Sequence, residues 1–449
     1  MDNQIKTQID RFKSGFPELE VVRPASIGDG ILKLTQEEEE RFIAFFDRSN
    51  QSVEKFVPAS GAATRMFQDL LEFQKTGKRS SEVDKFFSAF DRLPLEIKGL
   101  EEDEVLEDIL GKKAWHQKPK GLLPFHQYED GYRSAFEEHF YEGLEYALKN
   151  GLVKLHFTIA PNHLDQFKEE SERLIKKIGK DFEVSFSVQD PNTDSIAVYE
   201  NEDIVKLPDG EYLKRPAGHG ALLGNLGALN SDVIFIKNID NVVPDRLKDQ
   251  TIHYKKVLGG VLLHYQEKCF ELLNQLRKGN DVVGPAKKLL SEMGMENVPD
   301  DELANYLNRP LRVCGMVQNT GEPGGGPFWI NQDGKQSLQI IEASQLNSNN
   351  ESHQEALSGS THFNPADLVC SIKDLDGNKF SLNMFRDDDM GIITIKDFQG
   401  TKIRALELPG LWNGSMANWN TIFIEIPLIT FNPVKRITDL LRKEHQPAI

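Results

Sequence analysis

KFVPASGAATRM, residues 55–66, is the stretch that decides the fold. It predicts the end of a short strand, then a turn of small residues, then a helix whose apolar face begins at Met66. Such a turn lets backbone N–H groups approach a phosphate, and the N-terminus of a helix adds partial positive charge. We therefore expect Thr64 to cap the helix and Arg65 to reach a phosphate. The alternative is a tight strand–helix connection without a ligand, and the absence of a following Gly-Lys-Ser/Thr excludes a Walker A loop.

Strands and helices alternate on both sides of this stretch. Residues 152–159 and 184–188 have the alternating pattern of strands, and residues 233–236 are continuously apolar, like a strand buried on both faces. Helical patterns cover about 161–178 and 250–292. This order predicts an α/β fold with a three-layer, mainly parallel sheet.

The remaining segments predict additions to that α/β domain. Residues 1–50 are polar and are expected to form a helical N-terminal extension, with a capping box over 35–38. The α/β domain then occupies residues 51–449 and holds a charged helical insertion at about 80–150. The part from about 310 to 430 is richer in strand patterns and glycine.

Composition narrows the classes of partner. The net charge is −17, and no basic stripe is present, which argues against a nucleic-acid partner because phosphate neutralisation drives such binding. The three cysteines lie far apart without metal spacing, as expected in a reducing compartment. The polar start predicts no signal peptide, and no apolar run reaches the ~18 residues of a membrane span. A cytoplasmic protein with no membrane partner is therefore expected.

Two further motifs lie within one strand–helix span. Gly218 and Gly220 flank His219 in a compact turn that would let the backbone lie against a flat base. The buried strand 233–236 is followed by Asp240, at the position where open α/β sheets bind ligands, and this carboxylate could hold Mg²⁺ against phosphate oxygens. The alternatives are a core or capping histidine and a turn-forming aspartate.

The C-terminal half carries a glycine-rich segment and a lysine. Residues 321–329 read GEPGGGPFW, which predicts an irregular loop that could admit a sugar, the alternative being a long hairpin. Lys435 follows a strand and a proline-fixed turn and precedes a capped helix. It could direct its charge at phosphates, whereas a lone lysine is usually solvated surface.

The order of these motifs resembles the UDP-sugar pyrophosphorylases, the UDP-glucose and UDP-N-acetylglucosamine uridylyltransferases. The resemblance covers roughly residues 53–442, and the chain as a whole looks like a bacterial family, a domain of unknown function, distantly related to those enzymes. Six segments carry it in the family's order, with one more near the uracil: 58–66 for L-x-x-G-x-G-T-x-M, 216–220 for P-x-G-H-G, 238–241 for N-I-D-N, 325–326 with 340–345 for G-G and L-L-E-x-x-Q, 363–365 for F-N-T-N-N, 430–441 for R-F-x-P-V-K-x-x-x-D-L-L, and 186–189 for F-x-Q.

The resemblance implies a nucleotide-diphospho-sugar transferase fold of the GT-A type and a role for each matching residue. It implies nucleotide binding by Ser60, Gly61, Ala62, Ala63, Thr64, Gln189, Gly218 and His219. It implies sugar binding by Gly325, Gly326, Glu342 and Asn364. Arg65 and Lys435 would neutralise phosphate charge as the catalytic residues, and Asp240 would hold Mg²⁺.

Three departures from the family separate this chain from it. Ala62 and Ala63 stand where glycine is expected, and no lysine follows Met66 at the usual spacing, so that Arg65 would carry more of the charge. The resemblance to the UDP-glucose enzymes ends soon after Leu441, so we do not expect their C-terminal β-helix or the oligomerisation that it provides.

The expected function is transfer of a nucleotidyl group from a nucleoside triphosphate, UTP first among them, onto a sugar 1-phosphate, with release of pyrophosphate. The alternatives are a non-catalytic sugar-nucleotide-binding protein, which the altered loop would favour, and a GT-A-type glycosyltransferase, against which Lys435 argues because that reaction has no triphosphate to neutralise. All of this requires Thr64, His219, Asp240 and Lys435 to serve one nucleotide.

Overall fold

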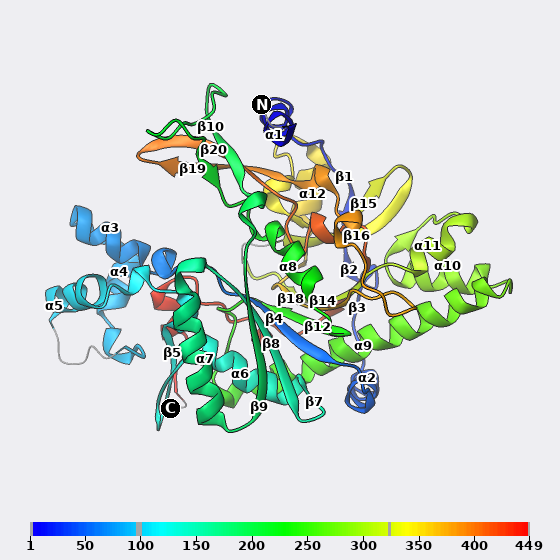
Figure 1. Cartoon of the computed structure of the whole chain (residues 1–449), viewed down its shortest axis with the longest axis horizontal. Coiled ribbons are helices and arrows are strands. Elements are labelled where there is room, and N and C mark those ends of the chain that lie inside the picture. Colours follow the sequence, from blue (N-terminus) through cyan, green and yellow to red (C-terminus); the bar gives the residue numbers. More distant parts are fainter. Residues whose placement is uncertain (1–2, 96–100, 322–324, 448–449) are drawn as a thin grey trace. The chain divides into compact units, whose positions relative to one another are not determined.

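A computed structural model describes residues 3–95, 101–321 and 325–447 (Figure 1). The chain divides into two compact units. Unit 1 consists of residues 1–49, 189–233 and 257–427, and unit 2 of residues 50–188, 234–256 and 428–449. Each unit is built from segments far apart in the sequence, so a division at residue 50 does not separate them.

Unit 2 contains residues 55–66, the strand end, small-residue turn and following helix. Its strands are β4 (Val53–Pro58), β5 (Pro124–Tyr128), β6 (Gly131–Ser134), β7 (Leu148–Lys149), β8 (Leu152–Ile159), β9 (Asp181–Val188) and β12 (Val233–Lys237). Its α-helices are α3 (Gln68–Thr76), α4 (Ser81–Phe87), α5 (Glu102–Leu106), α6 (Ala135–Tyr146) and α7 (Leu164–Ile178). Helix α9 (Asp245–Arg277) begins here, and the 3₁₀ helices include Ala63–Phe67 and Ile437–Leu441.

The sheet of unit 2 has the order β12-β4-β8, with β9 and β7 also paired to β8. Strand β8 is parallel to β4 and to β9, as the alternation of strands and helices predicts. Helices α6 and α7 lie against these strands (Figure 1). Phe136 of α6 packs on Phe157 of β8 and Phe167 of α7, so aromatic rings fill the layer between sheet and helices.

Unit 1 contains several sheets. Its strands are β1 (Glu20–Pro24), β2 (Ser26–Ile27), β3 (Gly30–Leu32), β10 (Ser195–Tyr199), β11 (Lys214–Arg215), β13 (Met295–Glu296), β14 (Leu311–Gln318), β15 (Gly325–Gln332), β16 (Lys335–Glu342), β17 (His362–Phe363), β18 (Asp367–Ser371), β19 (Ile392–Phe398), β20 (Thr401–Glu407) and β21 (Asn420–Glu425). Its α-helices are α1 (Asn3–Ser14), α2 (Gln36–Arg48), α8 (Leu223–Ala228), α10 (Val283–Glu292), α11 (Leu303–Leu307) and α12 (Glu351–Ser358).

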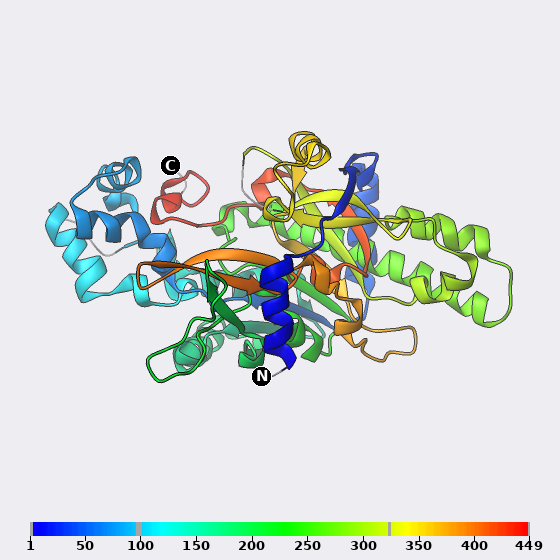
Figure 2. The same cartoon turned by 90° about the horizontal axis from the view of Figure 1, so that it is seen from above.

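The strands of unit 1 are both parallel and antiparallel. The series β2-β3-β21-β14 is parallel, whereas β18 joins β14 in the antiparallel sense. Two antiparallel sheets have the orders β1-β15-β16-β13 and β11-β10-β20-β19. Helix α1 lies beside β10 and β20 (Figure 2). Phe12 of this helix packs against Ile196 of β10 and Leu406 of β20.

The comparison with the expectations is therefore mixed. The fold is α/β, and the strands and helices predicted for 152–292 are present, with a break between α9 and α10. The capping box at Thr35 and Glu38 is confirmed. The helical extension over 1–50 also contains β1, β2 and β3, and the insertion at 80–150 also contains the β5–β6 hairpin. The sequence pattern does not reveal these short strands, because each contains few apolar residues.

No α-helix in the described part of the chain combines the length and the apolar character that crossing a bilayer requires.

Candidate functional site

Asp240 lies just beyond the carboxyl end of strand β12 in unit 2. The strand is buried along its whole length, which explains its continuously apolar sequence. The turn after it is fixed by backbone hydrogen bonds: Ile239 N–H donates to the Pro58 carbonyl at 3.4 Å, and Val434 N–H donates to the Asp240 carbonyl at 3.2 Å. The carboxylate of Asp240 is buried in this turn.

Two lysines meet on that carboxylate. Lys120 Nζ donates to Asp240 Oδ2 at 2.6 Å, and Lys435 Nζ donates to the same oxygen at 2.9 Å. Burial by itself would raise the pKa of Asp240, but the two ammonium groups outweigh it and lower the pKa to about 2. Burial lowers the pKa of Lys120, an effect that Asp240 opposes and Lys435 reinforces. The result is a cationic cluster held around one ionised carboxylate.

The two lysines differ in exposure. The side chain of Lys120 is 14% exposed, whereas that of Lys435 is 62% exposed. Lys120 is therefore fixed in the wall of unit 2, while Lys435 can turn toward a bound anion without losing packing. A phosphate placed here would meet two charge-assisted donors.

The small-residue loop is tied to the segment that carries Lys120. Lys120 N–H donates to the Gly61 carbonyl at 3.1 Å, and Ala63 N–H donates to the Lys118 carbonyl at 3.0 Å. Ala62 forms a backbone bridge with Pro119. The loop thus lies beside Lys120, and the side chains of Ser60, Thr64 and Arg65 on it are exposed.

Two expectations about this loop are wrong. Thr64 does not cap a helix: its hydroxyl donates to the His116 carbonyl at 3.0 Å, and the residue lies inside a 3₁₀ helix that starts at Ala63. The α-helix begins only at Gln68, so the element that directly follows the loop is a 3₁₀ helix and not the N-terminus of an α-helix. The hydrogen bond to residue 116 could not be foreseen, because the loop and its partner are joined only by the tertiary fold.

Lys55, Glu142 and Lys237 form a buried ion cluster in unit 2. Glu142 of α6 accepts from Lys55 of β4 and from Lys237 of β12, both at 2.8 Å, and all three side chains are within 1% of complete burial. His139 Nε2 donates to the Ile239 carbonyl at 3.2 Å. Burial lowers the pKa of Lys55 to about 7, whereas the two lysines hold the pKa of Glu142 well below its usual value against the effect of burial. These contacts fix β4, β12 and α6 to one another, and His139 holds the residue that precedes Asp240.

The turn at His219 lies in unit 1. Gly218 has φ +75°, in the left-handed region that favours glycine. A Cβ on Gly220 would lie 2.1 Å from the Pro409 carbonyl oxygen, so only glycine fits against that segment. Both glycines are therefore required by the backbone itself, which gives this turn a fixed shape.

His219 is held by three neighbours. Its ring stacks on Trp412 with centroids 4.2 Å apart, and its Nδ1 accepts from Leu411 N–H at 2.8 Å. The neutral ring therefore carries its proton on Nε2, which lies 3.6 Å from Glu342 Oε1. Glu342 also accepts from Asn413 Nδ2 at 3.0 Å. The contact with His219 is the main cause of a lowered pKa at Glu342.

The residues expected to bind sugar come together around Glu342. Gly325 is paired with Glu342 across the β15–β16 hairpin, and Asn364 N–H donates to the Gly325 carbonyl at 2.7 Å. Asn364 is buried, and its Nδ2 has no hydrogen-bond partner. A buried amide without a partner is a feature that a ligand hydroxyl would satisfy.

The prediction of an irregular loop over 321–329 is wrong from Gly325 onward. Gly325 and Gly326 lie in strand β15, the hairpin that was the alternative. A Cβ on Gly325 would lie 2.8 Å from Ile340, so this glycine serves close strand packing. The part of the prediction that covers residues 322–324 lies outside the described residues.

Gln189 does not join this group. Its amide donates to Thr193 Oγ1 at 3.5 Å and to Asp194 Oδ1 at 3.4 Å, both in the turn that follows it. Both hydrogen bonds are thus local, and neither reaches His219.

The predicted residues therefore fall into two groups. Unit 2 brings together the loop 60–65, Asp240 and Lys435, and unit 1 brings together His219, Glu342, Gly325 and Asn364. The sequence analysis missed Lys120, Trp412 and Asn413. Pro119-Lys120-Gly121 and Trp412-Asn413-Gly414 are charged or aromatic residues beside glycine, a weak signal that the many other turns of the chain share.

The described residues provide no cluster of three or more side chains of the metal-binding types His, Cys, Asp and Glu. Asp240 supplies one ionised carboxylate, and its Oδ2 is already shared by two ammonium groups. Such a donor set does not make a cage of protein ligands. It fits a Mg²⁺ that takes one carboxylate and otherwise oxygens of a substrate, the usual mode for that ion.

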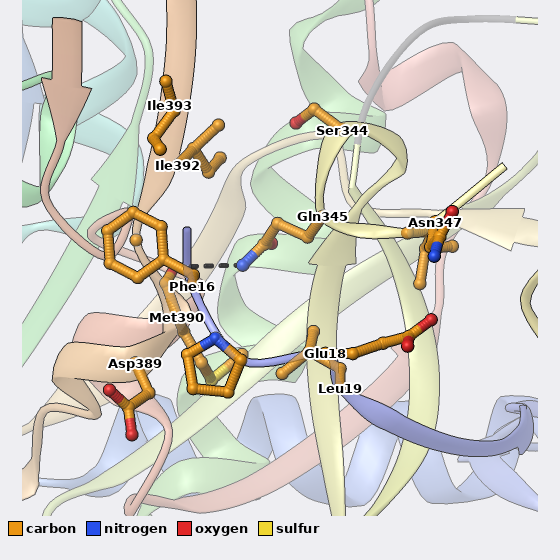
Figure 3. Close-up of a pocket in the computed structure, with 13 residues that line it drawn as sticks. Phe16, Glu18, Leu19, Ser344, Gln345, Asn347, Asp389, Met390, Ile392 and Ile393 are labelled. Carbon is orange, nitrogen blue, oxygen red and sulfur yellow. Dashed lines mark hydrogen bonds between the residues drawn. The ribbon is translucent and has the colours of Figure 1, made fainter. Parts of the chain in front are cut away.

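A hollow of about 340 Å³ lies in unit 1 behind the turn that follows Glu342 (Figure 3). Three segments line it: 16–19, 344–347 and 389–393. Gln345 Nε2 donates to the Met390 carbonyl at 3.0 Å across it. Its carboxylates already have partners, Asp389 with Arg11 and Glu18 with Asn350. This hollow adds no unpaired group to the site.

Comparisons with known proteins complete the description. The structure of a single-residue mutant of UDP-glucose pyrophosphorylase from Leishmania major is similar over 97% of this chain and 73% of that chain, with 13% identity and a TM-score of 0.49. The structure of UDP-glucose phosphorylase from Trypanosoma brucei is similar over 98% of this chain and 75% of that chain, with 12% identity and a TM-score of 0.46. The structure of the inositol-1-phosphate CTP transferase from T. maritima is similar over 84% of this chain and 86% of that chain, with 8% identity and a TM-score of 0.33.

A search of curated proteins finds no match. The sequence itself matches a described family over nearly its whole length, from residue 1 to residue 446. That family is the domain of unknown function DUF4301, and the chain belongs to it.

Proposed function

We propose that this protein is a nucleotidyltransferase that joins a nucleoside triphosphate, with UTP as the first candidate, to a sugar 1-phosphate and releases pyrophosphate. The observation that carries the proposal is the meeting of Lys120 and Lys435 on Asp240 next to the loop 60–65. Phosphoryl and nucleotidyl transfer need positioning and charge neutralisation more than a covalent nucleophile, and this cluster offers both.

Each part of unit 2 has a role in the proposal. The exposed residues of the loop, Ser60 to Ala62 and Thr64, would contact the triphosphate, and Arg65 would add a bidentate donor. Lys120 and Lys435 would neutralise charge as the α-phosphorus is attacked by an oxygen of the sugar 1-phosphate and pyrophosphate leaves. Asp240 keeps the two ammonium groups in place before the substrate arrives. Lys120 would thus supply the lysine that does not follow Met66 in the sequence.

In unit 1, His219 and Glu342 are assigned to the base and to the sugar. The fixed Nε2–H of His219 and the flat face of Trp412 suit a planar base, which aromatic rings bind by stacking. Glu342 and Asn364 suit sugar hydroxyls, since one offers acceptors and the other an unpaired donor. Gly218 completes the base-reading set in the proposal, whereas Gln189, whose amide donates to the turn that follows it, is given no role.

Mg²⁺ belongs to the proposal as the partner of the phosphates, with Asp240 as its protein ligand. When bound, it would supply Lewis-acid stabilisation of phosphate oxygens. The residues of the chain bind, orient and neutralise the substrates.

The proposal is tested first by thermal shift with a panel of nucleoside triphosphates and sugar 1-phosphates, each with MgCl₂. Ligand binding to the native state raises its stability by mass action, so a true substrate raises the melting temperature. The stabilising pair is then assayed for pyrophosphate release, with Asp240→Ala as the variant that abolishes release while the fold, followed by circular dichroism, stays intact.

Three results would overturn the proposal. A triphosphate that binds without pyrophosphate release from any sugar 1-phosphate identifies a sugar-nucleotide-binding protein. Consumption of a sugar nucleotide only when an acceptor is added identifies a glycosyltransferase. Unchanged turnover in Asp240→Ala refutes the role of the cluster.

A further inference from the structure

A hollow of about 290 Å³ lies at one edge of the sheet β1-β15-β16-β13 in unit 1. It is lined by residues of β13, the end of α11, the β15–β16 hairpin and the segment that precedes β21. None of its lining residues belongs to either group described above. The side chain that sets its character is Arg309, between α11 and β14.

The guanidinium of Arg309 has no carboxylate partner. It lies 3.5 Å above the ring of Tyr306, and its Nη1 donates to the Asn418 carbonyl at 3.4 Å. Within the part of the chain that the structure describes, no Asp or Glu oxygen is in ion-pair contact with it. Burial is the main influence on Arg309 and lowers its pKa. Because Arg309 lines the hollow and no carboxylate of the described residues pairs with it, its charge is available to an anionic ligand there.

Other donors face the same hollow. Lys335 lies 5.4 Å from the Tyr306 ring and is held at 2.8 Å by Glu302 outside the hollow, so its charge is fixed in position. Gln336, Ser337 and Asn418 add amide and hydroxyl groups. These side chains therefore place hydrogen-bond donors around the guanidinium of Arg309.

Two carboxylates also line the hollow. Glu296 is half-buried, and Asp333 is exposed in the turn of the β15–β16 hairpin. Carboxylates accept hydrogen bonds from hydroxyl groups and would repel a second negative charge. A ligand that suits both the arginine and the carboxylates has one anionic end and a hydroxylated remainder, and the volume limits it to a small molecule.

We propose that this hollow is a binding site for a small hydroxylated organic anion, whose carboxylate or phosphate pairs with Arg309 and whose hydroxyl groups face Glu296 and Asp333.

The site has a direct connection to the group around His219. The Asn418 carbonyl that Arg309 holds ends the segment 411–418, which also contains Trp412 and Asn413. Arg312 holds the same segment by donating to the Trp412 carbonyl at 2.6 Å. An anion that draws the Arg309 guanidinium toward itself changes one of the contacts that hold that segment, beside those of Arg312 and of Gln339, which donates to the Ala417 carbonyl at 2.6 Å. Occupancy of the hollow therefore acts on the residues that position His219 and Glu342.

The test is isothermal titration of the full chain with glycerol 3-phosphate, glycerate, acetate and inorganic phosphate at constant ionic strength. Glycerol 3-phosphate or glycerate should bind more tightly than the two simple anions, and which of them binds distinguishes a phosphate from a carboxylate head. Arg309→Gln should weaken that binding about tenfold to a hundredfold, the value of a charge-assisted contact. Arg277→Gln, an arginine of the same unit paired with Asp376, is the matched control.

Two further variants keep the outcome decisive. Asp333→Asn keeps an oxygen that can accept from a ligand hydroxyl but removes the negative charge that repels the anionic end, so it should tighten binding, which a variant that merely damages the fold cannot do. Lys435→Ala should leave it unchanged, since that lysine serves the other unit. Binding that survives Arg309→Gln but is lost in Lys435→Ala, or no binding of any probe, overturns the proposal.

Hydrogen exchange reports the connection separately. The ligand should slow exchange over residues 411–418, and Arg309→Gln should abolish that protection. Unchanged exchange with proven binding refutes the connection. Since no reading depends on turnover, this result is independent of whether pyrophosphate is released.

Discussion

Lys120 Nζ lies 2.6 Å from Asp240 Oδ2, although the two residues are 120 positions apart in the sequence. The contact joins the segment beside the small-residue loop to the end of strand β12. It turns a strand-end carboxylate, which alone would suggest a cation site, into the centre of a cationic cluster. The predictions below follow from this relationship and from the packing around it.

The charge of Asp240 should make stability depend on pH in acid. Its pKa in the folded chain is about 2, against an ordinary value of 3.8, so its contribution is complete above 3.8 and is lost as the pH falls through 2. By this shift the contribution is about 2 kcal/mol. Urea unfolding of the wild type and of Asp240→Asn should differ by a constant amount near neutrality, and the difference should shrink below pH 4. Asp91→Asn, at an exposed aspartate of the same unit, should show no such convergence; a gap for Asp240→Asn that is independent of pH would contradict the assignment.

The two lysines on Asp240 should separate stability from activity. Lys435→Ala removes an exposed side chain and should lower the free energy of unfolding by less than about 1 kcal/mol, while pyrophosphate release falls about a hundredfold or more. Lys120→Ala also loses a buried charge-assisted hydrogen bond and should cost about 2 kcal/mol of stability. Lys443→Ala, in the same C-terminal segment but 93% exposed, should change neither property. Full activity in Lys435→Ala would remove that residue from the proposed mechanism.

Gly61 should tolerate a side chain in the folded protein but not in the complex. A Cβ at this position meets no atom within 4 Å, and its φ is not in the left-handed region. Gly61→Val should therefore leave the melting temperature nearly unchanged and weaken triphosphate binding at least about tenfold, because the branched side chain covers the loop backbone. Gly284→Val, at an equally open glycine of helix α10, should not affect triphosphate binding. Equal affinity of Gly61→Val and wild type for the triphosphate would show that phosphate does not contact this loop.

Two glycines near His219 should respond in opposite ways to alanine. At Gly220 a Cβ would lie 2.1 Å from a backbone oxygen of Pro409, so Gly220→Ala should cost about 2 kcal/mol or more. Gly224 lies in helix α8 with no atom within 4 Å of an added Cβ. Gly224→Ala should therefore stabilise the protein by about 0.5–1 kcal/mol through lower entropy of the unfolded chain. Urea unfolding curves measure both, and equal effects would mean that Pro409 does not confine the turn.

The stability of the protein should be sensitive to the loss of one charge from the buried cluster of Lys55, Glu142 and Lys237. Glu142→Gln leaves Lys55 and Lys237 buried without a carboxylate, and breaking such a buried ion pair costs about 3–5 kcal/mol. Differential scanning calorimetry should show a correspondingly lower melting temperature. Glu169→Gln, on the exposed face of helix α7, is the control and should be neutral. A neutral Glu142→Gln would mean that the two lysines are already uncharged in the native state.

The sequence by itself determined the parallel strands of unit 2, though not its β5–β6 hairpin. Continuous or alternating apolar runs at β4, β8, β9 and β12 identified the strands because burial on a sheet is written into local periodicity. Asp240 and Lys435 also follow from local pattern, one after a strand end and the other after a proline-fixed turn, and their side chains are in contact. The capping box at Thr35 was local in the same sense.

Only the tertiary structure decided what these residues meet. Thr64 was expected to cap a helix and instead donates to His116, and Gly325 was expected in a loop and instead pairs with Glu342 in a hairpin. Lys120 has no motif of its own and acquires its significance from Asp240. Local sequence encodes burial and backbone preference over a few residues, whereas hydrogen bonds and ion pairs between segments 50 to 200 residues apart depend on how the whole chain packs.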